Sequence, residues 1–155
     1  MTTFEKIKEY LASGGAAFRT MHHEPTPTSE DSARARGEPM AIGGKALVMK
    51  VDDAFHVFVV SGARRVDSRK IRARLGAKKS RFATVQELRE LTGLEPGAVP
   101  PFGEPILPLK LFLDASMAEG DRIAFNAGSL TDSVIMSMPD YLRLARPEVF
   151  AFSEG

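Results

Sequence analysis

The chain has 155 residues, of which 43% are hydrophobic and 26% charged, and its formal net charge is only +1. This size and composition fit one globular domain over residues 1–155, because domains of about 100–150 residues are the commonest. The absence of cysteine excludes disulfides, thiolate metal sites and a cysteine nucleophile, and no apolar run approaches the ~18 residues of a membrane span, so we expect a cytoplasmic protein without a membrane partner.

Periodicity and helix-end signals predict a mixture of helices and strands. The first half of the chain is expected to hold a helix that begins at the capping box Thr2–Glu5 and ends at 14–15, a strand over 17–21, a helix over 29–36, and strands over 45–51 and 55–61 joined as a hairpin. A basic helix from Asp67 to Leu75 follows, and then a helix that begins at the capping box Thr84–Glu87 and ends at Gly93. The remaining elements are strands over 106–114, 122–126 and 133–136, and a last helix that starts at 137 and ends before Pro147. The hairpin is expected at the centre of the sheet.

Basic residues concentrate between Ser61 and Ala83, where nine Lys or Arg residues accompany one acid, whereas acidic residues outnumber basic ones elsewhere. Such clustering is typical of phosphate-backbone binding, although a solvated helix face is the simpler interpretation of a charge run taken alone. The basic helix lacks the partner helix and turn spacing of a helix-turn-helix, so DNA is not an expected partner.

The most informative motif is Gly-Ala-Val-Pro-Pro-Phe-Gly at 97–103, taken with Lys45 in a Gly-Gly-Lys turn. Proline donates no backbone hydrogen bond and fixes its own φ, so the main-chain groups of this loop cannot all pair internally. Such a loop can hold a small ligand against its main chain. A plain connection between a helix and a strand would also favour glycine and proline for conformational reasons.

These motifs and the order of elements resemble one known family. The Gly-Gly-Lys-Ala-Leu-Val stretch at 43–48, the helix within 66–76, the Thr92-Gly93 stop and the 97–103 loop resemble the YbaK-like aminoacyl-tRNA deacylases, which include the editing domain inserted in bacterial prolyl-tRNA synthetases and its free-standing relatives. The resemblance runs from about Met21 to Arg146. It implies an α+β fold in a single domain, with a mixed, curved sheet of about six or seven strands flanked by helices.

The resemblance also implies an activity, which is trans-editing. The enzyme would hydrolyse the ester that joins a wrongly attached amino acid to the terminal ribose of a transfer RNA, without metal or cofactor. Lys45 matches the family's essential lysine, and Gly97 and Pro101 match its glycine-x-x-x-proline loop, whose main-chain groups orient the water and meet the oxyanion. The implied partners are the acceptor end of aminoacyl-tRNA and an aminoacyl-tRNA synthetase, with the protein acting as a monomer or weak homodimer.

Further residues are assigned to binding. The resemblance places hydroxyl groups of the 26–29 loop near the aminoacyl group, Phe102 and Gly103 offer an apolar wall after the prolines, and the tRNA-binding residues are taken from the basic charge run. The predicted substrate-binding residues are Thr26, Thr28, Ser29, Phe102, Gly103, Asn126, Gly128 and Ser129, and the predicted tRNA-binding residues are Arg64, Arg65, Arg69 and Lys70. Several family members carry a histidine near the position of Asn126, and asparagine cannot act as a general base at neutral pH. Two of these assignments have structural alternatives, a helix cap at Ser29 and a bend between strands at 126–128.

The three histidines and Ser129 suggest no other catalytic scheme. His22 and His23 precede a proline-rich loop and can flank a pocket, but a pair without a third spaced ligand makes a weak metal site. His56 lies in an alternating strand and is expected to face solvent. Ser129 lacks the strained elbow of serine hydrolases. A non-catalytic RNA-binding or regulatory module with the same fold remains the alternative, because the family histidine is missing.

Overall fold

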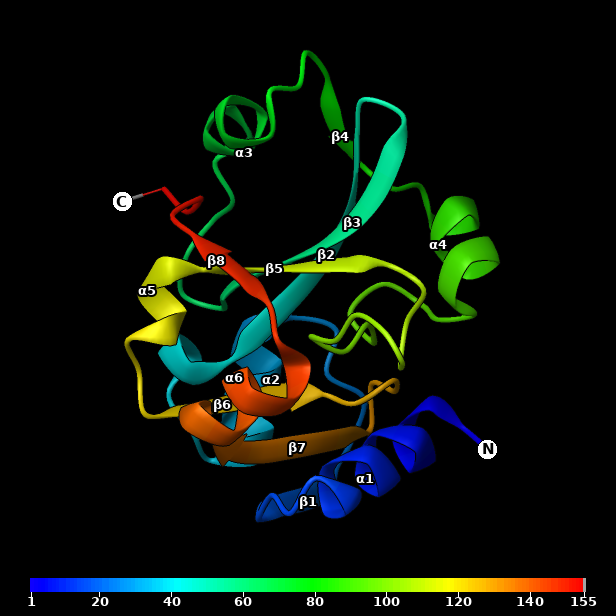
Figure 1. The fold of residues 1–155 in the computed structure, drawn as a ribbon. Coiled ribbons are helices and arrows are strands. Elements are labelled where there is room, and N and C mark those ends of the chain that lie inside the picture. Colours follow the sequence, from blue (N-terminus) through cyan, green and yellow to red (C-terminus); the bar gives the residue numbers. More distant parts are fainter. Residues whose placement is uncertain (155) are drawn as a thin grey trace.

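The computed structural model describes residues 1–154, and Figure 1 shows their fold as two groups of strands with helices around them. The helices are α1 (Thr3–Ser13), α2 (Ser29–Arg36), a 3-10 turn η1 (Met40–Ile42), α3 (Ser68–Leu75), α4 (Val85–Thr92), α5 (Ala115–Ala118) and α6 (Met138–Ala145). The strands are β1 (Phe18–His22), β2 (Gly44–Val51), β3 (Ala54–Ser61), β4 (Ser80–Phe82), β5 (Lys110–Asp114), β6 (Arg122–Asn126), β7 (Asp132–Ser137) and β8 (Glu148–Phe150). The α+β class is confirmed.

The strands form two sheets instead of the one sheet expected. A five-stranded mixed sheet has the order β4-β2-β3-β5-β8, and a three-stranded antiparallel sheet has the order β1-β7-β6. The predicted hairpin is confirmed, because β2 and β3 pair along their whole length and lie inside the larger sheet. A single parallel bridge joins Gly43 to Ala124, so the two sheets meet where β2 begins. This junction is where the candidate site lies.

Both faces of the larger sheet are covered. Val57 and Val59 of β3 contribute to the main core, which also takes side chains from the smaller sheet, α1 and α6, whereas Phe58 and Val60 point to a second core beneath α3. Each buried side chain of this kind contributes about 1.5–3 kcal/mol. A strand that is covered on both faces has a nearly continuous run of apolar residues, which is why β2 and β3 could be predicted from the sequence.

The helix ends follow the predicted chemistry closely. Thr2 and Glu5 exchange hydrogen bonds of 3.0 and 3.1 Å as a capping box, and Thr84 and Glu87 do the same. Helix α2, however, is capped by Thr28, whose Oγ1 accepts from the Asp31 amide at 3.1 Å. The cap role considered for Ser29 therefore falls to its neighbour.

Two local expectations were wrong. The strand expected over 106–114 begins only at Lys110, because residues 103–109 form turns in which a Cβ on Gly103 would lie 2.6 Å from the Leu109 carbonyl oxygen. His56 was expected to face solvent, but it is half-buried with its ring edge against Phe58 and Phe112, and its Nδ1 has no partner among residues 1–154. Burial and, second, the charge of Lys110 lower the pKa of His56.

The short elements β4, η1, α5 and β8 were not predicted. They span three or four residues each, which is too short for a periodic pattern to stand out. Strand β8 exists because it pairs in parallel with β5, a contact between segments more than 30 residues apart. Over residues 1–154 no helix is both long enough and apolar enough to cross a membrane.

An ion pair between β4 and α4 should make the fold sensitive to acid. Arg81 donates to both carboxylate oxygens of Glu87, at 2.7 and 2.9 Å, and these bonds, with the Thr84 amide, lower the pKa of Glu87 from 4.5 to about 2. A depressed folded pKa means that the carboxylate stabilises the fold above about pH 4.5 and that this contribution disappears as the pH falls toward 2.

The substitution Glu87→Gln should therefore lower the free energy of unfolding at pH 7, while glutamine keeps the capping bond to Thr84. Urea unfolding of both proteins from pH 7 down to pH 2 measures the difference. The two proteins should converge toward pH 2. A constant difference across that range would contradict the assignment.

Candidate active site

A cavity of about 290 Å³ opens between α2, the start of β2, the loop at 97–99 and the end of β6. Six of the residues predicted from the sequence line it: Thr26, Thr28, Ser29, Lys45, Gly97 and Asn126. Ser32 and Arg36, which the sequence did not single out, complete its polar wall. Lys45 and the bend at Gly97 are therefore brought to one small cleft from segments 52 positions apart in the chain.

The later part of the 97–103 loop does not line this cavity. The Pro101 carbonyl accepts a hydrogen bond of 2.6 Å from the hydroxyl of Tyr141, which is fully buried. Phe102 is 1% exposed and packs edge-to-face on Phe125 and Tyr141. Gly103 lies against the main chain of Leu109. These three residues hold the loop against the core, while Gly97 and Val99 face the cavity.

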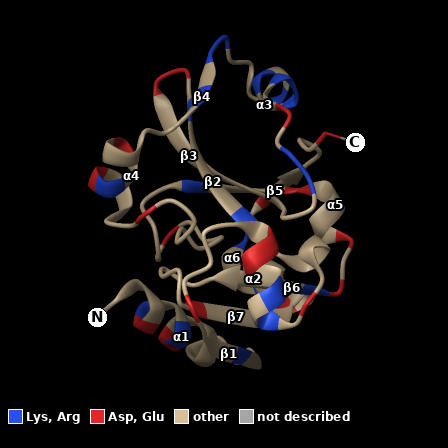
Figure 2. Cartoon of the chain, turned by 180° about the vertical axis from the view of Figure 1, so that it is seen from behind, with Lys and Arg blue, Asp and Glu red and all other residues tan. Residues whose placement is uncertain are grey.

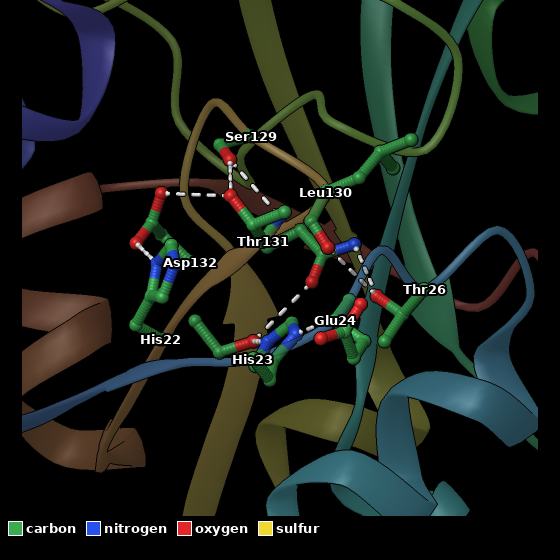
Figure 3. Close-up of polar contacts among 10 residues, drawn as sticks. His22, His23, Glu24, Thr26, Ser129, Leu130, Thr131 and Asp132 are labelled. Carbon is green, nitrogen blue, oxygen red and sulfur yellow. Dashed lines mark hydrogen bonds and ion pairs between the residues drawn. The ribbon is translucent and has the colours of Figure 1, made fainter.

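Gly128 and Ser129 also lie outside the cavity lining. A Cβ on Gly128 would meet Thr3 at 2.7 Å, and φ is 83°, so this glycine allows α1 to approach the turn. The hydroxyl of Ser129 bonds to that of Thr131 at 2.8 Å, as Figure 3 shows. Ser129 Oγ also accepts from the Thr131 amide at 3.0 Å, so its hydrogen bonds go to its neighbour in the turn and not to a histidine that could activate it.

Lys45 stands at the edge of the cavity, near the start of β2. Its Nζ donates to the Arg64 carbonyl at 3.1 Å, and the side chain is half-buried. Burial and, second, the positive charge of Arg65 lower its pKa. The ammonium is thus partly desolvated and lies beside the basic segment, the run of Lys and Arg residues between Ser61 and Ala83. These surroundings favour the binding of an anionic group.

Gly97 adopts φ 85°, a left-handed conformation that favours glycine. Its carbonyl accepts from Asn126 Nδ2 at 2.9 Å, so one of its two lone pairs is occupied. Within residues 1–154 the amides of Gly97 and Val99 make no hydrogen bond, whereas the Ala98 amide between them donates to Glu95. The loop therefore offers free main-chain donors beside the cavity.

Asn126 connects this loop to a buried arginine. Arg36, at the end of α2, is 7% exposed and donates through Nη2 to Asn126 Oδ1 and through Nε to Ser133 Oγ, both at 2.9 Å. Burial lowers the pKa of Arg36 to about 10, so it stays charged at neutral pH. Sequence reasoning missed Arg36, because an arginine in the last turn of a polar helix resembles an ordinary solvated helix end.

The two neighbouring histidines face different surroundings. His23 bonds through Nδ1 to the Glu24 carbonyl at 2.8 Å (Figure 3) and through Nε2 to Ser133 Oγ at 2.7 Å. A carbonyl only accepts, so Nδ1 carries the proton and Nε2 accepts from the serine when the ring is neutral. His22 is exposed and pairs with Asp132 at 2.8 Å. No group of three or more acidic or histidine residues within 1–154 could hold a metal ion.

Two of the four predicted tRNA-binding residues, Arg64 and Arg65, lie beside the Lys45 side chain at the cleft. Both are exposed and border the Lys45 ammonium, and Figure 2 shows further basic residues along the ribbon of α3. Lys70 Nζ donates to the Ser153 carbonyl at 2.9 Å, and Arg64 donates to the Ser153 hydroxyl at 3.3 Å. The basic segment is thus fixed by the C-terminal segment.

Comparisons with known proteins identify the family to which the chain belongs. The family model described as the aminoacyl-tRNA editing domain matches residues 23–144. The multifunctional Ser/Thr-tRNA deacylase ProXp-y of Escherichia coli K12 is 38% identical over 156 residues, covering 97% of this chain and 92% of that protein. A proline–tRNA ligase of Bacillus licheniformis is 32% identical over 101 residues, which are 63% of this chain and 18% of the ligase.

A solved structure described as a candidate trans-editing enzyme for prolyl-tRNA synthetase superposes with a TM-score of 0.86 at 27% identity, and the match covers all of this chain and 99% of that one. The family match spans most of the chain, and the fold match spans all of it. The resemblance inferred from the sequence is therefore confirmed. The chain belongs to the aminoacyl-tRNA editing domain family, and the predicted aminoacyl-tRNA deacylase activity is confirmed at the level of that family.

Proposed function

We propose that this protein removes a small hydroxylated amino acid, serine or threonine, from mischarged transfer RNA in trans. The observation that carries the proposal is the joint lining of one small cavity by Lys45, Gly97 and a hydroxyl-rich wall. The 38% identity to a Ser/Thr-tRNA deacylase over nearly the whole chain supports the choice of amino acid. The cavity volume of about 290 Å³ suits a small aminoacyl group.

The chemistry needs no titrating base among the lining residues. A water oxygen adds to the ester carbonyl carbon, the bond to the ribose oxygen then breaks, and that oxygen takes up a proton, which leaves free amino acid and tRNA. The unpaired amides of Gly97 and Val99 can stabilise the oxyanion, and the second lone pair of the Gly97 carbonyl can orient the water. Lys45 would hold the terminal phosphate or the ester region as a point charge.

Release of amino acid from a panel of seryl-, threonyl-, alanyl- and cysteinyl-tRNAs tests the proposal. We expect rapid release from the seryl and threonyl esters and slower release from the alanyl ester. If no ester is cleaved while the protein still binds tRNA, the non-catalytic RNA-binding module would be the better description.

The basic segment should account for much of the affinity for tRNA. Arg65 and Arg69 are exposed in this segment, so each is expected to neutralise one phosphate. Replacing either by alanine should weaken tRNA binding and make the slope of log K against log salt shallower by about 0.7–0.9. Fluorescence titration at several salt concentrations measures both quantities. Arg89→Ala is the control and should leave the slope unchanged. It removes an exposed arginine of α4 that is paired with Glu95.

A further inference from the structure

The guanidinium of Arg36 is buried without a carboxylate. Its hydrogen-bond partners within residues 1–154 are neutral, the amide oxygen of Asn126 and the hydroxyl of Ser133. The third nitrogen, Nη1, makes no hydrogen bond there and is not sealed off from solvent. It lies beside the main chain of Gly43, where a Cβ would be 3.5 Å away, at the cavity wall.

A charge held in this way is costly unless something compensates for it. Burial of a cation is tolerated when hydrogen bonds or an opposite charge satisfy it, and two neutral partners satisfy only part of this group. The free N–H groups of Nη1 can only donate, so a ligand atom at this position must be a hydrogen-bond acceptor. An α-ammonium group is excluded from this position by its like charge.

We propose that Arg36 is a specificity-determining residue, whose Nη1 donates a hydrogen bond to the side-chain hydroxyl oxygen of the aminoacyl group. The proposal rests on the proposed deacylase function. Lys45, at the rim beside Arg64, is placed for the terminal phosphate or the ester region, whereas Arg36 is 7% exposed and faces the interior of the cavity. The aminoacyl side chain is the part of the substrate small enough to reach it.

The surrounding contacts make this donor rigid. Nε and Nη2 are tied to Ser133 and Asn126, so Nη1 points in a fixed direction. Asn126 at the same time donates to the Gly97 carbonyl at 2.9 Å, so one amide holds both the specificity group and the hydrolytic loop. A site built to hydrogen-bond a substrate hydroxyl discriminates strongly against an analogue without it, because the buried donor is then left unpaired.

The test compares seryl with 2-aminobutyryl esters on the same tRNA, since the second replaces the hydroxyl by a methyl group of similar size. For the wild-type protein we expect kcat/KM to favour seryl by on the order of 10²–10⁴-fold. In Arg36→Met the preference should fall below about 10-fold, chiefly through slower seryl hydrolysis, with the 2-aminobutyryl rate changed much less. Arg34→Met, an exposed arginine on the same helix, is the control and should keep the full preference.

Each alternative result has a definite meaning. A wild-type preference near one overturns the proposal without any variant, so the test survives if Arg36→Met fails to fold. Equal loss for both esters in a folded variant also overturns it, since Arg36 would then support catalysis or the loop generally. Hydrolysis of neither ester by the wild type would contradict the proposed function itself, which is a distinct outcome.

Discussion

Replacing Lys45 by alanine should lower kcat/KM for the hydrolysed aminoacyl-tRNA by about 10²–10³-fold, the loss typical when one charged or donating group is removed from a transition-state site. The half-buried ammonium is the cationic group placed between the cavity and the basic segment, so its loss leaves the terminal phosphate or the ester region without its partner. Single-turnover deacylation measures the change.

The substitution Lys45→Ala should have little effect on the stability of the fold. Within residues 1–154 the side chain of Lys45 makes one hydrogen bond, to the Arg64 carbonyl, and is only half-buried, so we expect the free energy of unfolding to change by less than about 1 kcal/mol. Lys50→Ala, further along the same strand and outside the cavity lining, is the matched control and should keep full activity. A folded Lys45→Ala protein with wild-type rates would remove Lys45 from the mechanism.

Local signals in the sequence were sufficient for much of the fold. Capping boxes at Thr2 and Thr84 and the turn between β2 and β3 depend on residues within three or four positions of one another, and all were predicted. The pairing of Lys45 with the Gly97 bend was inferred from family resemblance, and the structure places both at one cavity. No local rule would have joined them.

What the sequence could not supply depends on distant contacts. Arg36 gains its importance from Ser133 and Asn126, which lie 97 and 90 positions away. Phe102 was assigned to the pocket because, after two prolines, it could supply an apolar wall, yet it packs in the core against Tyr141. Sequence spacing gives no direction to a side chain in an irregular loop, so a residue beside a functional bend can face either way.

The C-terminal segment also depends on contacts between distant residues. Asp114, at the end of β5, anchors this segment through hydrogen bonds to residues 152 and 153. Its carboxylate is 1% exposed and accepts from the amides of Phe152 and Ser153 at 2.7 and 3.0 Å, from the Ser153 hydroxyl at 2.9 Å, and from Ser116. Burial alone would raise the pKa of Asp114, but hydrogen bonds from Ser116, Phe152 and Ser153 outweigh it and lower the pKa below 3.8.

Asp114→Ala should therefore lower the free energy of unfolding by about 3 kcal/mol or more, because it leaves several buried hydrogen-bond donors without an acceptor. Asp114→Asn should lose less, since its amide oxygen can still accept from both backbone amides and the serine hydroxyls can turn to accept from its nitrogen. Urea unfolding at pH 7 measures both changes. The gap between wild type and Asp114→Asn should shrink as the pH falls through the depressed pKa, because the wild-type carboxylate then becomes neutral.

Loss of this anchor should also disturb the predicted tRNA-binding residues. Ser153 receives hydrogen bonds from Arg64 and Lys70, and the Glu154 amide donates to the Arg65 carbonyl, so the segment held by Asp114 in turn holds the basic residues beside Lys45. At a temperature where Asp114→Ala remains folded, its affinity for tRNA should fall, while the seryl preference proposed for Arg36 should persist. Unchanged tRNA affinity in that folded variant would mean that the basic segment keeps its shape without the C-terminal contact.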